Sequence, residues 1–345
     1  MRKLLRVLVY ATAAVLLVGA AAAVYLLLID GAAPPPRPGL VRLPENAPPP
    51  PRGYPTMNAL YLAYLLGRVE ILDPHGDIPV PEGVVEQRGV EYGRVDGRPL
   101  LLDLYAPEDA SEPLPGLIFI HGGGWQSGDK SDYKYYTVRF AKRNCVAATI
   151  GYRHIGEAKF PAAIEDAKCA VRWMRANAEK LHVNPGQIVV IGGSAGGHLA
   201  LMAGYTADTG LFVNGGHEDA SGAVAGVVDL YGPVDLTTPE ARTNSTVTAF
   251  FDHSYAEDPE PYRLASPIHH LHPGAPPTLI IQGTIDDIMP VGQSDALAER
   301  LQALNVPYWY DRVEGYPHTM DVAPAINERV QWLISAFLDR FIRKQ

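Results

Sequence analysis

The stretch Gly192–Gly196, with the sequence GGSAG, decides the fold because of the segments on either side of it. An apolar, β-branched run at 187–191 precedes it and is typical of a buried strand. Residues 197–203 follow it and indicate a helix. A serine at such a sharp strand-to-helix turn, here Ser194, is held out on a tight elbow where glycines let backbone segments approach closely. The N–H groups that begin the helix stabilise negative charge developing beside that serine.

A second apolar run, at 117–120, leads into the glycine-rich sequence His121–Trp125, HGGGW. Consecutive glycines leave backbone N–H groups uncovered, so that they can point at a developing oxyanion. We expect the N–H groups of Gly123 and Gly124, together with that of Ala195, to form an oxyanion hole. His121 itself is interpreted as a structural hydrogen-bonding residue, and so is His198 in the helix after the elbow.

A nucleophilic serine also needs a base and an orienting carboxylate. The apolar run at 278–282 is followed by Asp286 and Asp287, where a carboxylate just past the end of a strand should lie. The run at 308–313 leads into a loop that carries His318. The resulting chain order of serine, aspartate and histidine is that of α/β-hydrolases, and it differs from the orders of chymotrypsin and subtilisin.

With these motifs the chain resembles carboxylesterases of the α/β-hydrolase fold, in the group with hormone-sensitive-lipase-like and feruloyl- or acetyl-esterase-like members. The resemblance covers residues 85–343 and implies a mostly parallel eight-stranded sheet flanked by helices. The matching pieces are His121–Trp125, Tyr152-Arg153, Phe160–Ala163, Asp166–Asn177, Gly192–Gly197, Gly283–Pro290 and His318.

One position departs from the family pattern, in which Gly-x-x-Asp is often followed by a non-acidic residue. Here Asp286 and Asp287 are adjacent, and the spacing from Gly283 favours Asp286 as the triad member, with Asp287 as the alternative. The resemblance implies a Ser194–Asp286–His318 triad that cleaves short-chain acyl or aryl esters through an acyl-enzyme. The expected substrate is a small-molecule ester, and an acylated carbohydrate is one candidate.

Four other functions stay open at this point. The same fold carries serine peptidases and aryl-formamidases, and a lipase could act on the membrane to which the chain is attached. A non-catalytic anchored binding module is a further alternative, although such a module needs neither a triad nor a glycine-rich hole. The motifs do not choose between acyl chain lengths, because these depend on the shape of the pocket.

Other patterns argue against other classes of function. His253, His269, His270 and His272 lack the i, i+4 spacing of a helical zinc motif, so no metal site is expected. No phosphate-binding or dinucleotide-binding glycine motif is present, so no cofactor is implied. The formal net charge is −9, from 29 basic and 38 acidic residues. Nucleic-acid binding is therefore not expected, since it requires clustered Lys and Arg.

The N-terminus carries a second strong signal. Arg2, Lys3 and Arg6 precede 23 uncharged residues, Val7–Ile29. Such a run is long enough to span a bilayer as a helix, and the basic flank should remain cytoplasmic. We therefore expect a membrane anchor with the catalytic domain outside the cytoplasm. A cleaved signal peptide is the alternative, because Ala20–Ala23 offers small residues for processing.

The remaining sequence divides the chain into further segments. Residues 1–30 are assigned to the transmembrane or signal segment, and the proline-rich residues 31–55 to a linker that favours extended polyproline II. Residues 56–84 are expected to form a helical segment that covers the domain or flanks its active-site mouth. The catalytic domain takes up 85–345, with an insertion at 233–276 that shapes the substrate site. The aromatic residues of that insertion line the pocket or form a small core of their own; they are Phe250, Phe251, Tyr255 and Tyr262.

Within the catalytic domain, the patterns predict an antiparallel hairpin around Asp96-Gly97, followed by parallel strands separated by helices. Parallel strands of this kind place an active site at their carboxyl ends. Cys145 and Cys169 are expected to be buried thiols, although export would permit a disulfide between them. No oligomeric state is indicated.

Overall fold

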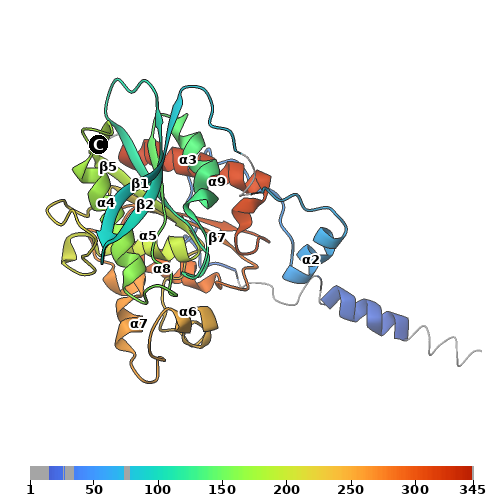
Figure 1. Ribbon diagram of the computed structural model, residues 1–345. Helices are drawn as coiled ribbons and strands as arrows, with labels where there is room; N and C mark the ends of the chain where they lie inside the picture. The colour runs from blue at the N-terminus through green and yellow to red at the C-terminus, as the bar shows by residue number, and fades with distance from the viewer. Residues whose placement is uncertain (1–14, 26, 28–34, 74–77, 344–345) are drawn as a thin grey trace, which may run out of the picture.

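The computed structural model describes residues 15–25, 27, 35–73 and 78–343. Its central feature is an eight-stranded sheet in the order β1-β2-β4-β3-β5-β6-β7-β8 (Figure 1). The strands are β1 (Val84–Val95), β2 (Arg98–Pro107), β3 (Leu114–Ile120), β4 (Val146–Ile150), β5 (Val183–Gly193), β6 (Gly226–Leu230), β7 (Thr278–Gly283) and β8 (Tyr308–Val313). The helices are α2 (Met57–Leu65), α3 (Lys134–Ala141), α4 (Ala162–Ala176), α5 (Ala195–Tyr205), α6 (Ser245–Ala249), α7 (Glu260–Leu264), α8 (Gly292–Ala303) and α9 (Pro324–Phe337).

The sheet is mixed, because β2 runs antiparallel to both of its neighbours, β1 and β4. From β4 through β3 to β8, each strand is parallel to the next. The predicted hairpin around Asp96-Gly97 is confirmed, and both of these residues have positive φ angles, 48° and 81°. Two central residues with positive φ suit the twist of a two-residue hairpin. The sheet is thus mostly parallel, as expected, except that β2 runs antiparallel to the strands on either side of it.

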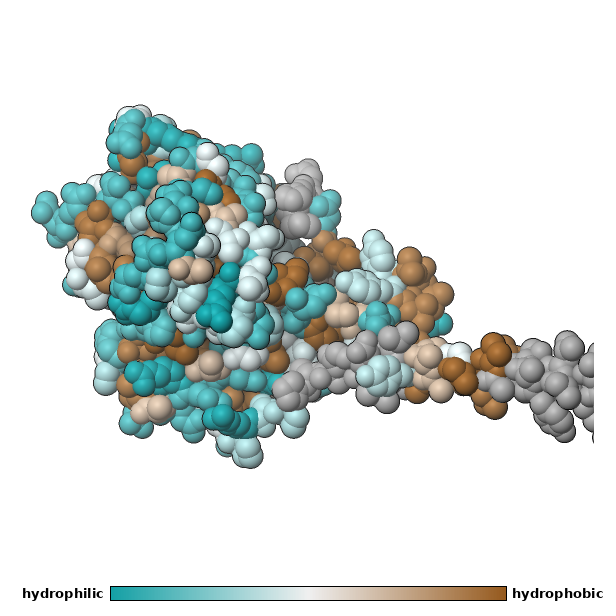
Figure 2. All heavy atoms as spheres, turned by 90° about the horizontal axis from the view of Figure 1, so that it is seen from below, coloured by the Kyte–Doolittle hydropathy of each residue, from teal (hydrophilic) through white to brown (hydrophobic). Residues whose placement is uncertain are grey.

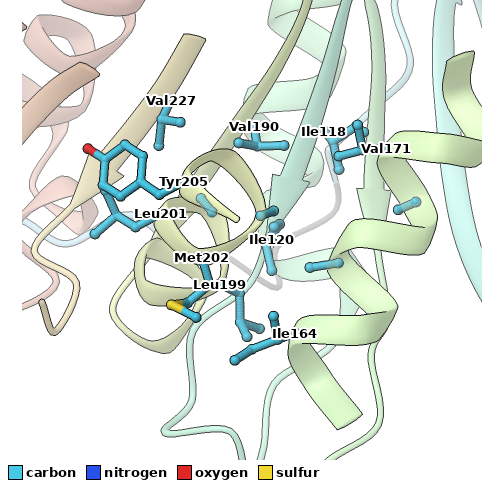
Figure 3. Packing of buried hydrophobic residues seen from close by; sticks show 14 of the residues in the cluster. Ile118, Ile120, Ile164, Val171, Val190, Leu199, Leu201, Met202, Tyr205 and Val227 are labelled. Carbon is cyan, nitrogen blue, oxygen red and sulfur yellow. The ribbon is translucent and has the colours of Figure 1, made fainter. Parts of the chain in front are cut away.

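Alternate residues of the central strands face two separate hydrophobic cores, as the period of two in a strand requires. Ile118 and Ile120 of β3 belong to the core with α4, α5 and α8, whereas Leu117 and Phe119 belong to the core with α3 and α9. Figure 3 shows the first of these cores, in which Ile120 and Leu199 approach one another between the sheet and α5. All of these strand side chains are fully buried. The two helical layers thus fix the sheet, and with it the positions of its carboxyl ends.

Cys145 and Cys169 are both buried and free. They lie in different cores, since Cys145 packs with α3 and Cys169 belongs to the core with α4. The disulfide that export would permit is therefore not formed, and both residues fill core space as thiols. Burial raises the pKa of each thiol to about 11.

Part of the proline-rich segment packs on the edge of the sheet. The backbone of Arg42 exchanges two hydrogen bonds with Tyr310 of β8, with N···O distances of 3.3 and 2.8 Å. Leu40 is buried, and its carbonyl oxygen accepts a hydrogen bond of 3.0 Å from the Tyr308 hydroxyl. Residues 40–42 therefore extend the sheet beyond its last strand.

The N-terminal anchor was predicted over residues 7–29, of which 7–14, 26, 28 and 29 lie outside the described residues. Residues 15–25 are helical. Within the part of the chain that the structure describes, no helix is both long and apolar enough to cross a bilayer. The anchor remains a prediction from the sequence.

Candidate active site

Ser194 lies at the junction of β5 and α5 with φ 55° and ψ −125°, a backbone conformation that a residue with a side chain rarely adopts. The glycines around it make this turn possible. A Cβ atom at Gly192 would overlap the carbonyl of Gly196, and one at Gly196 would overlap the carbonyl of Ile120. The strained turn presents the Ser194 hydroxyl at the carboxyl end of β5.

The structure brings the three residues of the expected triad together. His318 Nε2 lies 2.8 Å from Ser194 Oγ, and His318 Nδ1 lies 2.7 Å from Asp286 Oδ2. Because an ionised carboxylate only accepts hydrogen bonds, the Nδ1–H group donates to Asp286 and leaves Nε2 to accept from the serine hydroxyl. The ring of Tyr231 packs edge-on against His318, with ring centroids 4.8 Å apart. Asp286 and Tyr231 therefore hold the imidazole in one orientation.

The two adjacent aspartates differ in their burial and contacts. Asp286 is 7% exposed, and its Oδ1 atom accepts hydrogen bonds from the backbone N–H groups of Ile288 (3.0 Å) and Met289 (2.7 Å). Gln282 donates to its Oδ2 atom at 2.8 Å. Asp287 is exposed. Asp286 is thus the carboxylate that contacts the histidine, held in place by three donors besides the imidazole.

The HGGGW loop turns beside the serine with φ angles of 100° at Gly123 and 60° at Gly124. A Cβ atom at Gly124 would come within 2.6 Å of Thr246 Cγ2, so only glycine fits there without a shift. Among the described residues, no acceptor is bonded to the N–H group of either glycine. Both glycines and Ala195 line the cavity that contains Ser194 and His318. The N–H groups expected to bind an oxyanion are therefore uncommitted and lie around the serine.

Two histidines near the site have other partners. Trp125 Nε1 donates to His198 Nδ1 at 3.3 Å, so that His198 Nε2–H donates to the carbonyl of Ala265 at 2.7 Å. Complete burial lowers the pKa of His198 to about 4, which keeps the ring neutral. His121 stacks on the ring of Tyr152 at 4.4 Å, and burial lowers its pKa as well. Both contacts agree with the structural role expected for these histidines.

The cavity around Ser194 has a volume of about 900 Å³. The insertion contributes Asn244, Thr246 and Val247 to its wall. The aromatic residues of the insertion do not line the cavity; Phe250 and Tyr262, for example, are fully buried in the core with α5. The insertion therefore shapes the site through α6, the residue before it and Pro233, while its aromatic residues form part of the core.

The histidine cluster after α7 has no arrangement typical of a metal site in the described part of the chain, where no three potential ligands converge. His270 Nε2 lies 2.7 Å from the carbonyl oxygen of Leu264, and burial lowers its pKa.

Sequence reasoning missed one side of the cavity. This side carries the side chains of Tyr133, Tyr135, Tyr136, Tyr231, Asp321 and Asn327. The sequence Tyr133–Tyr136, YKYY, places three tyrosines in four residues at the start of α3, and this cluster is the signal that could have indicated it. Asp321 comes from the segment just after His318. No motif in the sequence marks this second carboxylate as part of the site.

Comparisons with known proteins place these motifs in a wider group. Residues 102–301 match the family model described as BD-FAE. The chain is 34% identical over 228 residues to Esterase LipC and 30% identical over 275 residues to Esterase LipQ, both from Mycobacterium tuberculosis. These matches cover 64% and 77% of this chain but 56% and 65% of the relatives, so the chain spans little more than half to two thirds of their length.

A solved structure supports the same grouping. The butyrate-bound esterase Est2 of Thermogutta terrifontis has a TM-score of 0.65 and 26% sequence identity with this chain. The similarity covers 76% of this chain and 97% of that esterase. The region that is shared therefore corresponds to nearly the whole of a solved esterase.

Proposed function

Because the chain belongs to the BD-FAE family of α/β-hydrolases, we propose that it is a serine carboxylic-ester hydrolase acting on short-chain acyl esters of small molecules. One observation carries this proposal: the hydrogen-bonded series Ser194, His318 and Asp286 opens into a cavity that also holds uncommitted backbone N–H groups. A nucleophile, a base and an oxyanion site in one cavity are what acyl transfer requires.

The first half of the reaction forms an acyl-enzyme. His318 Nε2 accepts the proton of the Ser194 hydroxyl as Oγ attacks the ester carbonyl carbon, and the N–H groups of Gly123, Gly124 and Ala195 stabilise the oxyanion. Asp286 stabilises the imidazolium that forms and keeps the ring oriented. The tetrahedral intermediate then collapses, the bond to the alcohol oxygen breaks, and His318 donates its proton to the departing alkoxide.

The second half releases the acid. Water enters in place of the alcohol and gives a proton to His318 Nε2 while its oxygen attacks the acyl carbon. The bond to Ser194 Oγ breaks as this oxygen recovers the proton. The free acid leaves and the resting triad is restored.

The preference for a short acyl group is part of the proposal. The cavity lining includes the apolar side chains of Pro233, Val247, Ile288 and Met289, which suit a small alkyl chain. The similar Thermogutta terrifontis esterase was solved with butyrate bound. These two observations favour acyl groups of about the size of butyrate.

The experiment that tests the function is hydrolysis of p-nitrophenyl esters from acetyl to palmitoyl by the full chain and by its Ser194→Ala variant. We expect the fastest turnover for acetyl or butyryl esters and a loss of several orders of magnitude in the variant. The p-nitroanilide of the same acid separates ester from amide hydrolysis. Faster turnover of the anilide than of the ester would favour a peptidase or aryl-formamidase. Equal ester turnover by the Ser194→Ala variant would exclude the proposed nucleophile.

We further propose that the chain is anchored in a membrane by residues 1–30, with the catalytic domain outside the cytoplasm. The uncharged run Val7–Ile29 behind Arg2, Lys3 and Arg6 supports this. A second support is the apolar surface of α2 and the residues after it, where Tyr64, Leu65, Leu66 and Ile71 are all more than half exposed. Figure 2 shows hydrophobic atoms gathered on the side of the domain from which the N-terminal segment extends. Protease accessibility of the domain in intact cells and in lysed cells tests this orientation.

A further inference from the structure

The cavity has a second wall whose chemistry the proposed mechanism does not use. Tyr133, Tyr136 and Tyr231 belong to the core on the α3 and α9 face of the sheet, opposite the face that supplies Trp125 and Val247. With Asp321 and Asn327 they form the tyrosine wall of the cavity. These hydroxyl, carboxyl and amide groups therefore reach the cavity from the face of the sheet opposite Trp125 and Val247.

Asp321 is the carboxyl group at the centre of this wall. Its Oδ2 atom accepts a hydrogen bond of 3.0 Å from the Tyr136 hydroxyl, and its Oδ1 atom accepts one from the Tyr231 hydroxyl. Asn327 Nδ2 donates to the Tyr136 oxygen at 3.1 Å, so the phenolic proton of Tyr136 must point to the carboxylate. The carboxyl group thus lies between two phenolic hydroxyls, and burial raises the pKa of Asp321.

Tyr133 is the member of the wall that has no partner. It is 6% exposed, and in the described part of the chain its hydroxyl makes no hydrogen bond. This hydroxyl lies against Gly193, where a Cβ atom would overlap it and would come within 3.0 Å of the Tyr231 hydroxyl. The missing side chain at Gly193 therefore leaves room for two phenolic hydroxyls immediately beside the nucleophile. Because Tyr133 lines the cavity, its hydroxyl is available to a ligand there.

The wall lies on the leaving-group side of the reaction. The departing alkoxide receives its proton from His318, so the alcohol portion of the substrate must lie next to the imidazole. Tyr231 packs against that ring, and its hydroxyl is the one that approaches Gly193 together with that of Tyr133. Carboxyl groups of Asp73, Asp132 and Asp321 line the cavity, whereas none of its described lining residues is Lys or Arg.

We propose that the space between Tyr133, Tyr231 and Gly193 is a subsite for a free hydroxyl group on the alcohol portion of the ester. The inference rests on the proposed ester hydrolysis and narrows its substrate class to esters of polyols. The substrate hydroxyl exchanges a hydrogen bond with Tyr133, and Asp321 fixes Tyr231 beside it. Tyr133 and Asp321 act here as specificity-determining residues. An alcohol that lacks the hydroxyl leaves Tyr133 unsatisfied, which is the basis on which such sites discriminate.

The test compares two butyrate esters that share the acyl group and a three-carbon alcohol. Glyceryl 1-monobutyrate carries two free hydroxyls and n-propyl butyrate carries none. For the full chain we expect kcat/KM to be about tenfold higher for the glyceryl ester, the size of one lost hydrogen bond. Tyr133→Phe should bring this ratio close to one. Tyr105→Phe, the same change at a buried tyrosine that does not line the cavity, should keep the wild-type ratio.

Each outcome decides a different point. Equal kcat/KM values in the wild type, or a ratio that survives Tyr133→Phe, would overturn the subsite while leaving ester hydrolysis intact. A preference for butyrylcholine over both esters would also overturn it, because the wall would then select a cationic alcohol. Failure to hydrolyse any of these esters, p-nitrophenyl butyrate included, would instead reject the proposed function.

Discussion

Asp286 Oδ2 lies 2.7 Å from His318 Nδ1, although the two residues are 32 positions apart in the chain. The contact exists because β7 and β8 are adjacent parallel strands whose carboxyl ends lie at the same edge of the sheet. Asp286 follows the first of these strands and His318 the second. The orientation of the catalytic imidazole in the proposed mechanism therefore depends on the pairing of these two strands.

The adjacent aspartates offer a matched test of this contact. We expect Asp286→Asn to lower kcat by about 10³- to 10⁴-fold, because the neutral amide no longer stabilises the imidazolium or fixes its tautomer. Asp287→Asn changes an exposed carboxylate one residue away and should leave kcat within about twofold, as surface changes usually do. Steady-state hydrolysis of p-nitrophenyl butyrate measures both. Similar losses in the two variants would contradict the assignment of the acid.

A second prediction concerns the glycine-rich loop. Gly124→Ala should lower kcat by about 10²-fold, since its Cβ would displace the loop from Thr246 and move an oxyanion donor. Gly210→Ala is the matched control, because its φ of 77° is also positive but nothing lies within 4 Å of the added Cβ. Both variants should lose stability of about 1 kcal/mol from the left-handed backbone, as thermal unfolding can show. If Gly210→Ala lost as much activity as Gly124→Ala, general destabilisation would explain both.

The pH dependence of stability should carry a contribution from Asp229 in β6. Its Oδ1 atom accepts a hydrogen bond of 2.9 Å from Gly232 N, and among the described atoms its Oδ2 has no partner. Burial raises the pKa of Asp229 to about 8. Between about pH 4, where an unfolded aspartate titrates, and pH 8, the folded state binds a proton that the unfolded state lacks. The contribution of Asp229 to the free energy of unfolding is therefore fully present below about pH 4 and is lost as the pH rises through about 8.

Asp229→Asn removes this titration and keeps the shape of the side chain. We expect the wild-type Tm to fall more between pH 5 and pH 8 than the Tm of the variant. The quantity compared is the change in Tm between pH 5 and pH 8 within each protein. Any pH-independent effect of the amide on stability therefore cancels. Parallel Tm profiles for the two proteins would show that Asp229 is ionised in the fold throughout this range.

The proposed membrane contact of α2 can be measured with a fluorescent label. Leu65 is 79% exposed, and both native cysteines are fully buried, so a thiol-reactive NBD dye should label Leu65→Cys selectively in the folded chain. In phosphatidylcholine vesicles the full-length protein should show blue-shifted NBD emission that spin-labelled lipids quench. Leu211→Cys, at an exposed position beside Lys168, is the control and should stay unquenched. An unquenched label at position 65 would mean that α2 lies away from the bilayer.

Much of the site could be predicted because each of its parts follows a strand. The resemblance to α/β-hydrolase carboxylesterases is confirmed, and the structure brings together Ser194, Asp286 and His318, each at the carboxyl end of a parallel strand. A local pattern of an apolar run followed by a polar turn is enough to indicate such positions. It does not decide between neighbours, which is why the choice of Asp286 over Asp287 needed the burial and contacts of each side chain.

The tyrosine wall could not be predicted for a related reason. Tyr133 precedes α3, Tyr231 follows β6 and Asp321 precedes α9, so their meeting depends on how two helices pack on one face of the sheet. Such long-range packing leaves no periodic signal in the sequence. The contact of Arg42 with Tyr310 is similar, because a proline-rich segment predicts an extended backbone but not the surface on which it lies.

That last contact affects how the protein behaves in solution. β8 is the end strand of the sheet, and an end strand with free N–H and C=O groups is a template on which another chain can add. Arg42 occupies two of those groups on Tyr310, and Leu40 covers the strand beside it. A shortened chain that begins after residue 45 would keep every residue proposed for catalysis but expose this edge, and we expect it to aggregate. We therefore expect the segment that carries Leu40 and Arg42 to keep this edge from pairing with a second copy of the chain.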